Sequence, residues 1–135
     1  VEVAPARTFC FLSEIEMLKE QGLIKGGGLD NALVIVDKKI DQIEINRLRN
    51  LFGIEEAIMR GANGILNGKL LRFKNEPVRH KTLDLIGDLA LLGTPIKGHV
   101  TAARAGHASN VEFVKKLKRV YATELEELWK GVENE

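Results

Sequence analysis

Three polar residues recur at intervals of four within the apolar segment PVRHKTLDLIGDL, residues 77–89. They are His80, Asp84 and Asp88, and a four-residue interval is close to one helical turn, so their side chains stack along one face of a helix. An imidazole and a carboxylate at this spacing both reach one divalent metal ion, and zinc accepts these ligands. The spacing also fits an intrahelical hydrogen bond between His80 and Asp84. We favour this hydrogen bond over a metal site, because a catalytic zinc site needs three protein ligands.

The other histidines and one basic run offer different chemistry. His107 in AGHASN lies just before a predicted helix, where backbone N–H groups favour negative charge. It either stabilises a developing oxyanion or caps the helix, and the local sequence favours the cap. His99, beside Gly98 in a predicted strand, is interpreted as structural. The run KKLKR at 115–119 is either a phosphate-binding patch or the solvated face of an amphipathic helix, and we favour the solvated face.

Composition excludes several classes of protein. The 135 residues suffice for one domain with a core, and the net charge of +1 provides no basic field for nucleic acid. The single cysteine, Cys10, excludes an intrachain disulfide, indicates a reducing compartment and is interpreted as a small core residue. No apolar run approaches the roughly 20 residues of a membrane span. The sequence begins at Val1 without methionine, so we expect a piece of a longer protein.

Local signals in the first part of the chain predict a helix followed by a strand. The helix lies in FLSEIEMLKEQG (11–22), where Ser13 and Glu16 match a capping box and Gly22 a C-terminal stop. Three consecutive glycines then permit a sharp turn into the strand ALVIV at 32–36.

The middle of the chain predicts a second helix and a hairpin. The helix lies in DQIEINRLRNLFG (41–53) with Asp41 as its cap, and turn residues flank a hairpin through GILNGKLLRF at 64–73. A third helix runs from Asn75 to the Gly93 stop and carries the three polar residues described first.

The last part of the chain predicts a strand and a final helix. IKGHVTAARA (96–105) is interpreted as a strand, and Ser109 and Glu112 as the capping box of the helix. Its apolar stripe repeats every 3.6 residues and comprises Phe113, Val114, Leu117, Val120, Tyr121, Leu125, Leu128 and Trp129.

Four stretches resemble a known enzyme family: ARTFCF (6–11), GLDNALV (28–34), NEPVRHKTLDLIGDLALLGTPIKG (75–98) and GHASN (106–110). They are similar to the C-terminal part of UDP-3-O-acyl-N-acetylglucosamine deacetylases, zinc amidases that remove the acetyl group from the sugar in lipid A biosynthesis. The resemblance covers residues 1 to about 120. The extra length at 37–64 is similar to variants fused to a β-hydroxyacyl-carrier-protein dehydratase, although no dehydratase sequence is present.

The resemblance implies a role for each matched residue. His80 and Asp84 would supply two ligands to one zinc ion, and His107 would act as a charged or acid group oriented by Asp88. Thr8 would lie beside the scissile carbonyl. Phe9 would bind the substrate by packing against its sugar. Further substrate-binding residues along the sugar-nucleotide path would be Glu14, Lys81 and Arg104. An acyl-chain passage is implied by Leu12, Ile15, Leu18, Leu29, Ala32 and Val34.

The resemblance also implies a fold and a missing partner. We expect an α+β fold, a mixed β-sheet packed on helices with a βαβ-type insert, as the second layer of a two-domain α/β sandwich. Residues 1–121 would form an incomplete C-terminal catalytic domain, with the insert at about 12–36 and an extra segment at about 37–64. Residues 122–135 would form the end of the last helix and a tail. The family's third zinc ligand and general-base glutamate lie in an N-terminal half, so we expect the isolated chain to be inactive.

We therefore expect part of a cytoplasmic zinc deacetylase of a Gram-negative type bacterium. Its partners would be an acylated UDP-sugar and the N-terminal half, with no nucleic acid, no transmembrane segment and transient contact with a membrane surface. The alternative is a non-catalytic binding or structural domain that keeps the fold. Six matched polar residues argue for catalysis: Thr8, His80, Lys81, Asp84, Asp88 and His107.

Overall fold

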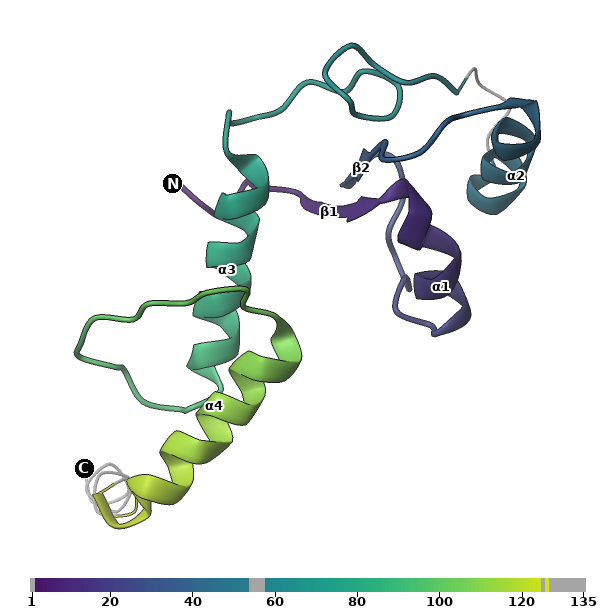
Figure 1. The fold of residues 1–135 in the computed structure, drawn as a ribbon. Helices are drawn as coiled ribbons and strands as arrows, with labels where there is room; N and C mark the ends of the chain where they lie inside the picture. The colour runs from purple at the N-terminus through teal and green to yellow at the C-terminus, as the bar shows by residue number, and fades with distance from the viewer. Residues whose placement is uncertain (1, 54–57, 125, 127–135) are drawn as a thin grey trace. The chain divides into compact units, whose positions relative to one another are not determined.

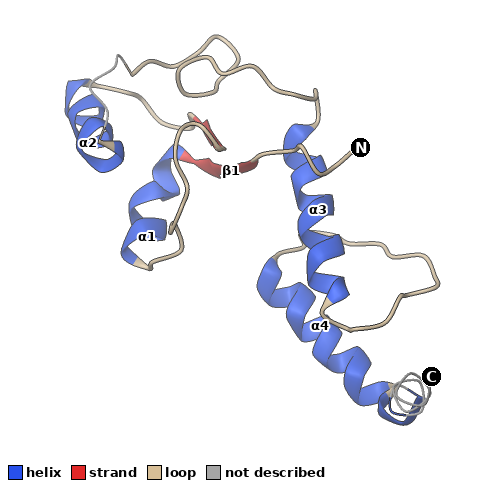
Figure 2. Ribbon diagram, turned by 180° about the vertical axis from the view of Figure 1, so that it is seen from behind, coloured by secondary structure: helices blue, strands red, loops and turns tan. Residues whose placement is uncertain are grey.

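Two compact units make up the chain in the computed structural model, which describes residues 2–53, 58–124 and 126. The N-terminal unit is Pro5–Pro77, and the C-terminal unit is residues 2–4 with those from 78 onwards. Within the described residues, strands occur in the N-terminal unit and helices in both (Figures 1 and 2). This mixture of helices with a small sheet agrees with the α+β class. None of the described helices is long and apolar enough to cross a membrane.

The N-terminal unit is built on two parallel strands, β1 (Thr8–Phe11) and β2 (Ala32–Ile35). The strands pair in register from Thr8 opposite Ala32 to Phe11 opposite Ile35. Parallel neighbours cannot be joined by a tight turn, so the chain must cross over between them. It does so through the 3-10 helix η1 (Leu12–Glu14) and the helix α1 (Ile15–Glu20), which gives a strand–helix–strand arrangement.

The predicted first helix is present, but its predicted capping box is wrong. The chain is already helical at Leu12, so Ser13 lies inside η1 rather than before a helix. Its backbone N–H and hydroxyl both donate to the Asp37 carboxylate, at 3.1 and 2.5 Å. The predicted stop is confirmed, because Gly22 adopts the left-handed conformation, with φ at 66°, directly after the C-cap residue Gln21.

The predicted second helix is confirmed as α2 (Gln42–Phe52). Asp41 caps it by accepting a hydrogen bond from the Glu44 N–H at 2.8 Å, and Gly53 ends it in the left-handed conformation. Its Leu48 is completely buried. The core of the unit joins residues from η1, α1, β2 and the position after it, α2 and the segment after α2: Leu12, Ile15, Val34, Val36, Leu48, Ile58 and Leu66.

The predicted hairpin at 64–73 is wrong. Within this described segment, Ile65 forms an isolated antiparallel bridge with Ile35 at the end of β2. The Leu66 N–H donates to the Val34 carbonyl at 2.9 Å, and the Val36 N–H donates to the Gly64 carbonyl at 2.8 Å. Leu66 also forms an isolated antiparallel bridge with Arg60, so the segment pairs with the end of β2 and with the residues before it instead of with the residues that follow it.

A buried ion pair joins Arg7, the residue before β1, to Glu76 at the start of α3 (Glu76–Ala90) within the N-terminal unit. The Glu76 side chain is fully buried and accepts hydrogen bonds from the Arg7 Nε at 2.9 Å and from the Arg7 backbone N–H at 2.9 Å. Its other oxygen accepts from the Arg72 N–H at 2.7 Å. The hydrogen bonds from Arg7 lower the pKa of Glu76 to about 2, so this carboxylate stays charged although it is buried.

The C-terminal unit consists of most of α3, a long loop at 91–106 and the helix α4 (His107–Val120). The third predicted helix is thus confirmed. The predicted strand at 96–105 is wrong, because these residues form loop, in which Arg104 adopts a left-handed φ of 53°.

The last helix is confirmed, with an earlier start than predicted. The Ser109 hydroxyl closes its first turn by accepting from the Gly106 N–H at 3.1 Å and donating to the Gly106 carbonyl at 2.9 Å. The predicted Ser109–Glu112 capping box is therefore wrong. Of the predicted apolar stripe, Leu125, Leu128 and Trp129 lie outside the described residues.

Candidate functional site

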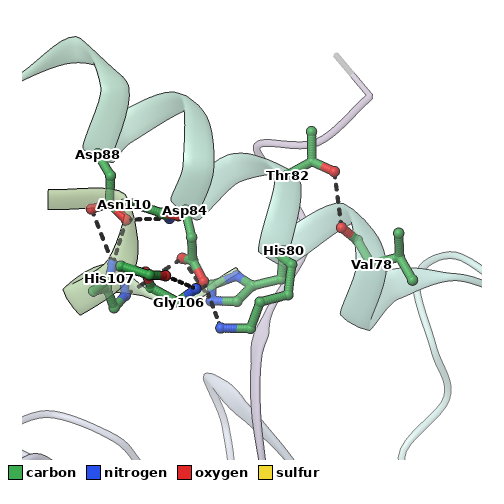
Figure 3. Close-up of polar contacts among 10 residues, drawn as sticks. Val78, His80, Thr82, Asp84, Asp88, Gly106, His107 and Asn110 are labelled. Atoms are coloured by element: carbon green, nitrogen blue, oxygen red, sulfur yellow. Dashed lines mark hydrogen bonds and ion pairs between the residues drawn. The ribbon is translucent and has the colours of Figure 1, made fainter. Parts of the chain in front are cut away.

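Helix α3 places His80, Asp84 and Asp88 on one face, one turn apart, as Figure 3 shows. The Nε2 of His80 lies 3.3 Å from Oδ1 of Asp84, and the two side chains are only 17% and 12% exposed. Lys81 places its Nζ 3.0 Å from the other oxygen of Asp84. The side chains of His80, Lys81 and Asp84 therefore form a compact polar group within the C-terminal unit.

The geometry of His80 and Asp84 fits two corners of a zinc site. At bond lengths of about 2.0–2.2 Å and tetrahedral angles, two ligand atoms lie roughly 3.3–3.5 Å apart. The 3.3 Å between the His80 nitrogen and the Asp84 oxygen matches this distance. Over the residues that the structure describes, no group of three or more His, Cys, Asp and Glu side chains is arranged to hold a metal ion.

Asp88 receives hydrogen bonds from the first turn of α4. Its two carboxylate oxygens lie 3.0 and 2.9 Å from Nδ1 of His107, and the Asn110 amide donates to it at 2.8 Å. Burial raises the pKa of Asp88, but the hydrogen bonds from Asn110 and His107 outweigh it and hold the pKa below its ordinary value. The residue is thus a stable carboxylate that fixes the orientation of the imidazole (Figure 3).

The two ring nitrogens of His107 have different surroundings. Nδ1 faces Asp88, which favours the tautomer with a proton on that nitrogen. Nε2 lies 3.9 Å from Oδ1 of Asp84, and the side chain as a whole is 68% exposed. The sequence had placed His107 before the helix, whereas it is the first residue of α4. An oriented imidazole with an accessible Nε2 is suited to proton transfer or to stabilising negative charge.

The sequence reasoning missed Asn110. It is buried, and its amide supplies the second donor to Asp88. The available signal was spacing, because a residue three positions after His107 lies on the same face of a helix. This signal applies only if the helix already begins at His107, which is earlier than the sequence predicts. Arg104 lies exposed in the loop before α4, and His99 lines a separate cavity of about 390 Å³ formed by this loop, α3 and α4.

The other predicted site residues belong to the N-terminal unit, which contains a mainly apolar cavity of about 530 Å³. Six predicted site residues from β1, α1 and β2 line it, and Phe52 from α2 lines it as well. The six are Thr8, Phe9, Ile15, Leu18, Ala32 and Val34.

Three predicted residues lie elsewhere in this unit. Leu12 is completely buried in the core, and Leu29 lines a second cavity of about 380 Å³. Glu14 is exposed, and its carboxylate accepts a hydrogen bond from the Phe11 N–H at 3.3 Å. Cys10 lines the apolar cavity, and burial raises the pKa of its thiol.

Comparison with known proteins gives consistent similarity to one family. The sequence profile of the family described as UDP-3-O-acyl N-acetylglycosamine deacetylase matches residues 1–52 and 45–119. The bifunctional enzyme LpxC/FabZ of Chlorobaculum tepidum is 58% identical over 119 residues, which are 87% of this chain and 26% of the relative. The UDP-3-O-acyl-N-acetylglucosamine deacetylase of Thermodesulfovibrio yellowstonii is 42% identical over 126 residues, 93% of this chain and 34% of the relative.

A second bifunctional enzyme LpxC/FabZ, from Bacteroides thetaiotaomicron, is 47% identical over 118 residues, 87% of this chain and 25% of the relative. The chain thus spans about a quarter to a third of the length of these curated relatives.

Proposed function

Because the chain belongs to the family of UDP-3-O-acyl N-acetylglycosamine deacetylases, we propose that it supplies the C-terminal part of a zinc-dependent deacetylase active site. The substrate is UDP-3-O-acyl-N-acetylglucosamine, and the reaction removes its N-acetyl group in lipid A biosynthesis. An N-terminal half completes the site, and we use "complete enzyme" for this chain joined to that half. We also propose that the fold forms the second layer of a two-layer sandwich and that the enzyme is cytoplasmic.

One observation carries this proposal, the oriented imidazole beside a metal-compatible pair. His107 is held through Nδ1 by Asp88, while its Nε2 is turned toward Asp84. When the ring is protonated, the Nε2 proton is a donor directed away from the orienting carboxylate. Such a donor stabilises negative charge that develops on the amide oxygen and is also placed to give a proton to the departing amine.

His80 and Asp84 are the residues of this chain that would hold zinc, with a third protein ligand from the N-terminal half. The chemistry that zinc brings when bound is polarisation of an amide carbonyl and activation of water at neutral pH. Lys81 neutralises part of the Asp84 charge through its 3.0 Å contact. Thr8 is the proposed hydroxyl donor at the scissile carbonyl, and Phe9, Glu14 and Arg104 are proposed to contact the sugar nucleotide.

The test of this function measures zinc content and deacetylation together. In the complete enzyme, His80→Ala and Asp84→Ala should each reduce bound zinc below one equivalent and abolish deacetylation, because each removes one of three protein ligands. His99→Ala is the matched control, since His99 lies in the loop before α4. This variant should keep both its bound zinc and its deacetylation activity. This chain without the N-terminal half should bind zinc only weakly. Tight one-to-one zinc binding by this chain that survives His80→Ala would place the metal elsewhere.

The apolar cavity of the N-terminal unit is the proposed acyl-chain passage. Ile15 and Val34 are core residues as well as lining residues, so enlarging them would strain the fold. Ala32 lines the cavity and is only half-buried, which makes Ala32→Phe a better probe.

In the complete enzyme, Ala32→Phe should lower kcat/KM for long-acyl substrates about tenfold more than for short-acyl ones, the effect of excluding roughly two methylenes from an apolar site. Ala62→Phe, at an exposed loop position outside the cavity, is the control. Equal losses for long and short acyl chains would contradict this assignment.

A further inference from the structure

One residue in the wall of the apolar cavity comes from the part of the chain that follows the expected insert at 12–36. It is Phe52, the last residue of α2, which lies in the extra segment at 37–64. The family profile matches the chain in two pieces, 1–52 and 45–119, and the overlap of these pieces falls within α2. This part of the wall therefore belongs to a region where the chain departs from a continuous match to its family.

Phe52 lies between two cavities of different character. It lines the apolar cavity of about 530 Å³ and also the second cavity of about 380 Å³. Gly27 and Gly28 line both cavities as well. The second cavity is also lined by Asp30 and Lys69, whose charged groups lie 3.3 Å apart. The aromatic ring and the glycine turn thus separate an apolar space from a space with charged walls.

Contacts between α1 and α2 hold Phe52 against the cavity. Nη1 of Arg47 lies 3.0 Å from Oε1 of Glu16 on α1. The Nζ of Lys19, also on α1, donates to the carbonyl of Leu51 at 3.4 Å, one residue before Phe52. Because Ile15 and Leu18 of α1 also line the apolar cavity, these contacts tie Phe52 to another part of the same wall.

We infer that Phe52 sets the maximum length of acyl chain that the apolar cavity accepts. The inference rests on the proposed function, in which this cavity receives the acyl chain of the substrate. Methylenes up to the ring are buried against apolar atoms, and each contributes about a fourfold gain in kcat/KM. Methylenes beyond the ring would displace water from the charged walls at Asp30 and Lys69, so they contribute no further gain.

The experiment compares kcat/KM of the complete enzyme over a series of straight-chain acyl substrates that differ by one or two methylenes. Phe52→Ala should move the preferred length upward, with about a fourfold gain for each additional methylene that the enlarged cavity buries. Phe52→Trp should move it downward, and this variant keeps the test decisive if the alanine variant folds poorly. Leu51→Ala changes the neighbouring residue of the same helix, which lines the second cavity and not the apolar one, and should leave the preferred length unchanged.

The outcomes separate this inference from the proposed function. Deacetylation with the same preferred length in the wild type and both Phe52 variants overturns the inference and leaves the function standing. An equal shift in Leu51→Ala also overturns it, because the effect would then belong to the helix rather than to the ring. Failure of the wild-type complete enzyme to deacetylate any member of the series overturns the proposed function and this inference with it.

Discussion

Replacing His107 with alanine in the complete enzyme should lower kcat by about 10²- to 10³-fold, the scale for losing one stabiliser of a developing oxyanion. The variant should keep its full zinc content, because Nδ1 is committed to Asp88 and His107 is not among the proposed ligands. The helix should also survive, since the contacts that close its first turn come from Gly106 and Ser109. Measurements of kcat and of bound zinc on the same preparation check the prediction.

Two further variants separate the role of His107 from general damage to the site. His99→Ala removes a histidine from the loop before α4 and should leave kcat near the wild-type value. Asn110→Ala removes one of the donors to Asp88 but keeps the imidazole, so it should lower kcat less than His107→Ala. Loss of zinc from His107→Ala would instead make this histidine a metal ligand.

The second large effect is expected on stability. Glu76→Gln should lower the free energy of unfolding by roughly 3–5 kcal/mol, because removing the charge of one partner leaves the other charge of a buried pair uncompensated. The side chain of Arg7 is only 10% exposed in this pair. The Glu112–Lys115 pair, with side chains 64% and 60% exposed, provides the control. Glu112→Gln should change the free energy of unfolding by less than about 1 kcal/mol.

The pH dependence of this stabilisation follows from the pKa of Glu76. Folding lowers that pKa from 4.5 to about 2, so between these pH values the unfolded chain binds more protons than the folded chain. Its stabilising contribution, about 3 kcal/mol, is therefore complete above pH 4.5 and is lost as the pH falls toward 2. The difference in stability between the wild type and Glu76→Gln should shrink over the same range.

Urea unfolding at several pH values measures this difference, and hydrogen exchange reports it at the site. The backbone N–H groups of Arg7 and Arg72 both donate to Glu76, so they should lose protection in Glu76→Gln. A difference in stability that stays constant from pH 6 to pH 2 would show that the charge of Glu76 is not its source.

Local signals predicted the helices well because their ends depend on neighbouring residues. Asp41 and Gly53 bound α2, and the stack of three polar residues on α3 follows directly from helical spacing. The metal-compatible distance between His80 and Asp84 follows from the same spacing. The orientation of His107 does not, because it depends on Asp88, which lies 19 residues earlier in the chain.

The wrong predictions share a physical cause, which is competition from distant partners. Asn67 and Gly68 both adopt the left-handed conformation that a tight hairpin turn uses. Even so, the backbone before them pairs with the end of β2, a contact that no local pattern encodes. Ser13 is a residue type that often caps helices, but its hydroxyl donates to the carboxylate of Asp37, which is distant in sequence. The cavity wall at Phe52 likewise depends on how α2 packs on α1.

The loop at 91–106 has a consequence for how this chain can change over evolution or by design. The entropy of closing a flexible loop grows only with the logarithm of its length, so doubling the length costs only about 0.6 kcal/mol. Residues 95–98 are exposed and line no described cavity. Segments inserted there should therefore change the free energy of closing the loop only slightly. Directly after the loop, His107 and Asn110 of α4 make hydrogen bonds to Asp88 of α3, which hold the two ends of the loop together. We therefore expect insertions in the middle of the loop to be tolerated, provided that the hydrogen bonds to Asp88 are kept.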